Sequence, residues 1–171
     1  HRVASYYSAK LHAKVEIGKV DFEFLKKLVL RDVYVEDQHK DTLLYSQAIK
    51  VDIGNIDFKQ HSLFVSNLTL DKSRFNAVMY KNDSDINLQF IIDYFASKDT
   101  TPSTGPKWDI KFGALTLNDI YFSYRNEHNS YQTTAMNFSD LRSHHSNGKI
   151  KDIQFPGDTL RATIESLSAQ E

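Results

Sequence analysis

Apolar and polar residues alternate along most of the chain, which predicts a mainly β protein. The clearest example is the segment 42–53, whose apolar side chains share one parity while polar ones occupy the other. Such a strand has one buried and one solvated face, which is typical of an antiparallel sheet. The apolar set is our candidate groove: Leu43, Tyr45, Ile49, Val51 and Ile53.

The pattern also predicts two short helices. Residues 1–13 place Val3, Tyr7 and Leu11 on one stripe, and residues 84–95 show a second apolar face at helical spacing. Two more strands are expected at 63–70 and 73–81, and others from Trp108 onward. Turns are expected at three places: 126–129, 146–148 and 156–158.

A linker rich in Ser, Thr and Pro follows the second expected helix. We therefore divide the chain into three parts: residues 1–96 with the helices and first strands, the linker 97–107, and a second set of strands at 107–171.

One eight-residue phrase recurs, and it is the strongest internal signal. The segments 28–35 and 115–122 agree in residue type at every position, and 63–70 follows the same scheme. In each copy the apolar residues change parity across an Asp or Asn, at Asp32 and Asp119 in the first two. A continuous strand would swap faces there, so we expect a β-bulge or a bend at these positions. Chance similarity between strand–turn–strand segments is the alternative.

The composition excludes several classes of function and site. The 171 residues have a net charge of −1, 40% hydrophobic residues and no cysteine. Disulfides and thiolate chemistry are therefore excluded, and no basic patch for nucleic acid is visible. No apolar run approaches the roughly 18 residues of a membrane-spanning helix. The chain begins at His1 without an initiator Met, so we expect it to be a fragment of a longer protein.

The residues that could be catalytic or bind a metal are better explained by structural roles. Adjacent side chains of an extended segment diverge, so His144 and His145 make a poor chelate, and the following Asn147-Gly148 favours a solvated turn. Asp37 and Asp41 flank a turn without the spacing of a calcium loop, so turn chemistry is the better interpretation. We predict no enzyme activity, no cofactor and no metal site.

Several segments resemble the TamB/AsmA-like family of envelope-assembly proteins. The resemblance lies in the first expected helix with the following segment 15–20, in 30–37, 41–45 and 49–53, in the expected helix near 85–92 and in the closing strand from Asp158. It implies a curved, groove-like sheet of repeated antiparallel strands with an apolar concave face. It further implies a periplasmic section of a protein anchored in the inner membrane and active in outer-membrane biogenesis. The expected partners are phospholipid or acyl chains and the outer-membrane assembly machinery.

Two simpler alternatives remain open from the sequence. The apolar face could be an ordinary core covered by the two expected helices. The chain could also be a β-sandwich-like interaction module that binds protein or carbohydrate through its loops.

Overall fold

The chain is mainly β, as the sequence predicts. We analysed a computed structural model, which describes residues 2–23, 26–96, 109–129, 137–154 and 161–170. Its elements in chain order are α1 (Arg2–Leu11), β1 (Val15–Glu23), β2 (Lys27–Glu36), β3 (Thr42–Asp57), β4 (Ser62–Met79), α2 (Gln89–Ala96), β5 (Asp109–Asn126), β6 (Asp140–Gln154) and β7 (Arg161–Gln170).

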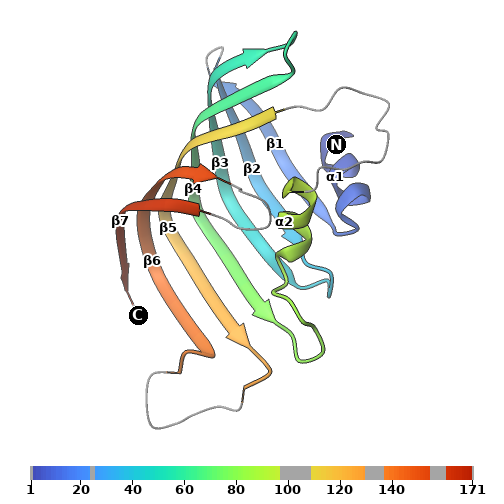
Figure 1. The fold of residues 1–171 in the computed structure, drawn as a ribbon, viewed down its shortest axis with the longest axis vertical. Coiled ribbons are helices and arrows are strands. Elements are labelled where there is room, and N and C mark those ends of the chain that lie inside the picture. Colours follow the sequence, from blue (N-terminus) through green and yellow to red (C-terminus); the bar gives the residue numbers. More distant parts are fainter. Residues whose placement is uncertain (1, 24–25, 97–108, 130–136, 155–160, 171) are drawn as a thin grey trace.

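All the described strands form one open sheet in the order of the sequence, from β1 to β7 (Figure 1). Neighbouring strands pair antiparallel, except that β4 and β5 pair parallel. The expectation of an antiparallel sheet is therefore wrong at this one junction. β5 begins at the same end of the sheet as β4, and α2 lies between the two strands in the sequence. A parallel pair requires such a crossover connection.

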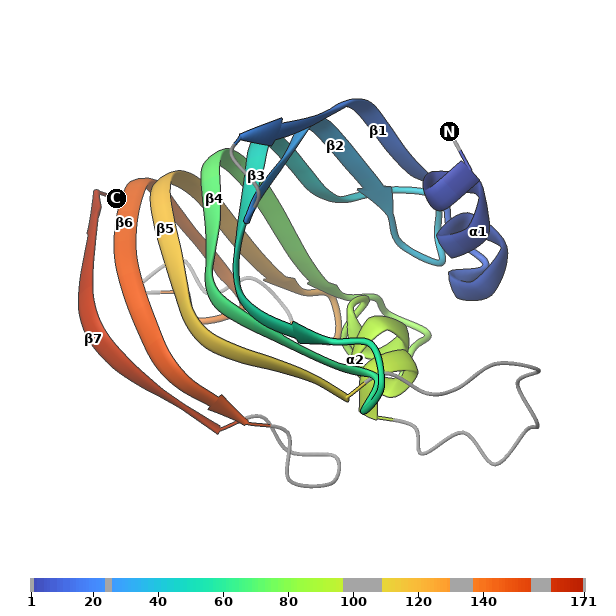
Figure 2. The same cartoon turned by 90° about the horizontal axis from the view of Figure 1, so that it is seen from above.

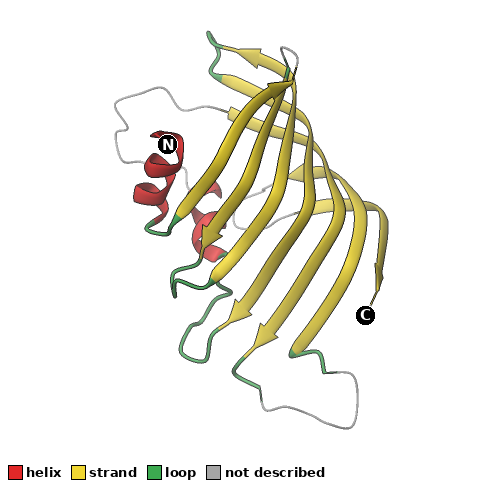
Figure 3. Cartoon of the chain, turned by 180° about the vertical axis from the view of Figure 1, so that it is seen from behind, coloured by secondary structure: helices red, strands yellow, loops and turns green. Residues whose placement is uncertain are grey.

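The sheet is strongly curved, and both helices lie on its concave side (Figures 2 and 3). In the described part of the chain, the backbone of each strand lies close only to its sheet neighbours, and the helix backbones lie close only to β1 and to each other. The alternative of a β-sandwich would require two packed sheets, whereas the described strands build a single sheet.

Both predicted helices are present. The first is fastened to β1 because the Ser8 hydroxyl accepts a hydrogen bond from the Val15 amide at 2.8 Å. The second begins at Gln89, five residues later than the pattern predicts, since residues 81–88 form turns. In those turns the side-chain oxygen of Asn87 accepts a hydrogen bond from the amide of Val78 at the end of β4.

A line of left-handed residues crosses the sheet where the repeated phrase predicts a bend. Asp32 in β2 and Asp119 in β5 have φ angles of 51° and 53°, so the expected irregularity is confirmed in both copies. Lys72 of β4, with φ of 45°, lies beside Asp119 in the parallel register. The pairing of β2 with β3 and of β3 with β4 has the same register on both sides of this line. β2, β3 and β4 therefore bend together without displacement of their pairing, whereas the register between β5 and β6 shifts on both sides of Ile120.

Two local predictions are wrong for the same reason. The segments 63–70 and 73–81 are one strand, β4, which passes through Lys72 without ending. Ser146, Asn147 and Gly148 lie inside β6 and form no turn, although His145 before them is left-handed with φ of 47°. The polar residues at the bend thus have a composition that is typical of a turn, although they lie inside strands. The linker 97–107 and the turn at 156–158 lie outside the described residues.

Candidate functional site

Two rows of apolar side chains cross the whole sheet on one face. Each row contains one residue from every strand, connected by the pairing register. The first row is Val20, Leu30, Ile49, Leu70, Leu117, Gly148 and Leu167. The second row is Phe22, Leu28, Val51, Leu68, Leu115, Ile150 and Ile164.

The two rows belong to the same face because they are two residues apart on β1 to β6, and side chains of a strand alternate between faces. The position of Gly148 confirms that side chains of neighbouring strands meet there. A Cβ atom at this glycine would lie 3.3 Å from Leu167 and 3.8 Å from Leu117. We call these residues the apolar rows.

The apolar rows are only partly covered. Their central members, such as Ile49 and Leu68, are half-buried. At the two sheet edges, Phe22 is 77% exposed and Leu167 is 64% exposed. Contiguous exposed apolar surface is unusual on a monomer, which makes the apolar rows the candidate site.

The opposite face of the same strands is charged. Arg31 pairs with Asp21 at 3.2 Å, and Lys50 pairs with Asp71 at 2.6 Å. We call this the polar face. The sheet therefore separates a partly exposed apolar surface from a hydrated, charged one.

The bend divides the five candidate groove residues. Ile49, Val51 and Ile53 are half-buried, and the first two belong to the apolar rows. Leu43 is almost fully buried at the start of β3. Tyr45 is 40% exposed and donates a hydrogen bond from its hydroxyl to Asp32 at 3.2 Å.

Tyr45 lies apart from the apolar rows because β3 crosses the bend between it and Ile49. It lines a surface hollow together with Lys72 and Asp119, and these two residues also line the hollow around Lys50 on the polar face. Counting alternate residues along the sequence places Tyr45 with Ile49 only if the strand is regular. Ser46 and Leu44, of the other parity, are the residues that continue the apolar side.

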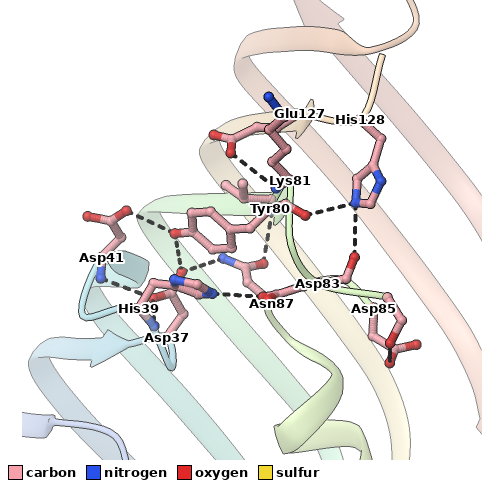
Figure 4. A network of polar contacts seen from close by, with 12 residues as sticks. Asp37, His39, Asp41, Tyr80, Lys81, Asp83, Asp85, Asn87, Glu127 and His128 are labelled. Atoms are coloured by element: carbon pink, nitrogen blue, oxygen red, sulfur yellow. Dashed lines mark hydrogen bonds and ion pairs between the residues drawn. The ribbon is translucent and has the colours of Figure 1, made fainter.

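A separate polar network joins loops at one end of the sheet (Figure 4). At its centre is Asp37, which is 1% exposed. One carboxylate oxygen accepts the amides of His39 and Asp41, at 2.9 and 3.0 Å. The other accepts the hydroxyl of Tyr80 at 2.7 Å and the side-chain amide of Asn87 at 2.8 Å.

Residues at the edge of this network also have interaction partners. His39 lies against the ring of Tyr80, and its Nε2 is 2.7 Å from a carboxylate oxygen of Asp83. This contact raises the pKa of His39 above its ordinary value. Burial, followed by the carboxylates of Asp37 and Asp41, strongly raises the pKa of the Tyr80 hydroxyl. Tyr80 therefore stays protonated and acts as a donor.

The network has the properties of a structural clasp. All four contacts of Asp37 are with donors of its own chain, as a buried carboxylate requires. Turn chemistry, the interpretation of Asp37 and Asp41 from sequence, is confirmed by the two amides bound within the turn. No local sequence pattern predicts the contacts of Asp37 with Tyr80 and Asn87, because these residues are 43 and 50 positions away from it along the chain.

Comparison with known proteins adds no family and no function to this geometry. No protein family, no curated protein and no solved structure matches this chain. Over the residues described, no helix has the length and apolar character needed to cross a membrane. The same residues contain no group of three or more His, Cys, Asp or Glu side chains placed to hold a metal ion.

Proposed function

We propose that this chain is a section of a β-groove protein whose apolar rows bind the acyl chains of phospholipid. The observation that carries the proposal is that both rows cross all seven described strands and have half-buried or exposed members from one sheet edge to the other. A partly exposed apolar face of this extent favours a partner, because its exposure to water is unfavourable.

The shape of the sheet supports an elongated apolar ligand. Both helices lie on the concave side, and α2 carries the apolar run Phe90, Ile91 and Ile92. We propose that the apolar rows face the same hollow and form its floor. Each CH₂ group transferred from water to such a surface contributes about 0.8 kcal/mol, so an acyl chain of many methylenes would be held firmly.

The resemblance to TamB/AsmA-like proteins adds a cellular location and a process to this proposal. In that setting the chain is periplasmic, belongs to a parent protein anchored in the inner membrane, and contributes to outer-membrane biogenesis. It would conduct phospholipid along the groove or assist the assembly of outer-membrane proteins, with the assembly machinery as partner of the full-length protein.

Native mass spectrometry of the purified chain tests the proposal, combined with organic extraction of any bound molecules. We expect phospholipid in a defined ratio, or its uptake when it is added. The double variant Ile49→Asp, Val51→Asp places two charges in the apolar rows and should abolish binding.

Gln47→Asp is the matched control, because it adds a charge to an exposed position of the same strand. It should bind lipid like the unmodified chain. Circular dichroism verifies that both variants fold. A chain that stays free of lipid under all conditions, or equal binding by the double variant, would contradict the proposal.

A further inference from the structure

A second surface feature lies on the polar face, at the bend. It is a hollow of about 290 Å³ whose lining includes Lys72, Arg74, Tyr121, His144 and His145. Three strands contribute these residues: β4, β5 and β6. The polar face thus gathers two cations and two imidazoles beside an aromatic ring, away from the apolar rows.

The two cations of this hollow differ from the others on the polar face. Lys27, Arg31 and Lys50 each have a carboxylate partner within 3.4 Å. Over the part of the chain that the structure describes, no carboxylate is within ion-pair distance of Lys72 or Arg74. Their charge is therefore available to a ligand.

Aromatic packing holds the basic groups in place. The guanidinium of Arg74 lies over the ring of Tyr121, 4.6 Å from its centroid. His144 packs edge-on against the same ring, with centroids 4.8 Å apart. A guanidinium stacked on a ring keeps its N–H groups free at the edge, where they match the oxygens of an anion.

The fourth basic group is His145, whose Nδ1 lies 2.6 Å from Asp119. This bond orients the ring and leaves Nε2 without a partner in the described structure. Asp119 is the acidic member of the lining, and His145 engages its carboxylate. A ligand therefore meets two cations that have no carboxylate within ion-pair distance, and the carboxylate of Asp119, which already has a partner. Asp71 lies near enough to Lys72 for this cation to contribute to the lowered pKa of the Asp71 carboxyl.

We propose that this hollow binds a phosphate monoester, with Arg74 and Lys72 as the charged contacts and the histidines as further hydrogen-bond partners. Several donors from different directions suit the tetrahedral phosphate group, and Arg matches two of its oxygens at once. The ligand is either a soluble phosphate ester or an anionic lipid headgroup. The proposal is independent of lipid binding, since the sheet separates this hollow from the apolar rows.

A nuclear magnetic resonance titration tests the site, with inorganic phosphate and glycerol 3-phosphate as probes and glycerol as the uncharged control. We expect shifts confined to signals of residues around the hollow. Lys72→Asn and Arg74→Gln should each weaken binding about tenfold, the value of one charge-assisted hydrogen bond. Asn is chosen at position 72 because it tolerates the left-handed φ of 45°.

Lys27→Gln removes the same charge from a paired position of the polar face and should leave the affinity unchanged. An equal loss in this control would show nonspecific attraction and overturn the site. Flotation with phosphatidylcholine vesicles, with and without phosphatidic acid, separates a headgroup from a soluble ester.

Binding of neither soluble phosphate nor phosphatidic acid vesicles would overturn the proposal. The variant Ile49→Asp, Val51→Asp must retain phosphate binding even when it loses acyl chains. Failure of one proposal is thereby distinguished from failure of the other.

Discussion

The hydroxyl of Ser73 donates a hydrogen bond to the hydroxyl of Ser46, 2.7 Å away on the neighbouring strand. Both side chains are buried next to the line of left-handed residues. Ser46 in turn donates to the backbone carbonyl of Ala48 at 3.0 Å. The bend therefore contains a small polar chain that satisfies a carbonyl inside the sheet.

We predict that Ser46→Ala destabilises the chain by about 1–3 kcal/mol, because it leaves the Ala48 carbonyl without this donor and the buried Ser73 hydroxyl without this acceptor. Thermal unfolding followed by circular dichroism measures the change. Ser66→Ala is the control, since this hydroxyl also binds a carbonyl, that of Asp52, but is exposed. Equal melting temperatures for the two variants would show that the buried serines do not stabilise the bend.

Asp37 should be the most sensitive residue of the structural clasp. Asp37→Ala removes the acceptor of four hydrogen bonds at a site that is 1% exposed. We expect the free energy of unfolding, measured with urea, to fall by about 3 kcal/mol or more. Removal of a buried, charged acceptor leaves its donors unsatisfied. Asp41→Ala removes a more exposed carboxylate that accepts only the Tyr80 hydroxyl, and should cost clearly less. The reverse order would contradict the central role of Asp37.

The contact between His39 and Asp83 predicts a dependence on pH. Because this contact raises the pKa of His39 in the folded chain, it stabilises the fold fully below the ordinary value of 6.5. That contribution is lost as the pH rises through the raised value. Titration of the imidazole by nuclear magnetic resonance measures the shift. In Asp83→Asn the pKa of His39 should fall, and an unchanged titration would exclude Asp83 as the cause.

The sequence predicts the strand content and the bend, because both are written in local patterns. Asp32 and Asp119 interrupt the alternation at one residue each, and a left-handed Asp is the simplest way to keep apolar residues on one face. Asn67 occupies the matching place in the third copy but is not left-handed; next to it, the register between β3 and β4 shifts at Ile53.

What the sequence does not predict depends on contacts between distant residues. The parallel pairing of β4 with β5 leaves no local trace, since each strand has the same alternation in either direction. The place of Tyr45 depends on how Asp32 and Lys72, on both neighbouring strands, bend the sheet around β3. The clasp around Asp37 likewise needs Tyr80 and Asn87, which only the fold brings close.

The most direct test of acyl-chain binding by the apolar rows is methyl nuclear magnetic resonance with a spin-labelled fatty acid. Broadening by the label reports which face the chain contacts. We predict strong broadening of the methyl groups of Val51, Leu68 and Leu115, and little for Thr69 and Thr116 on the polar face of the same strands. Equal broadening on both faces, or none on the apolar rows, would contradict the account.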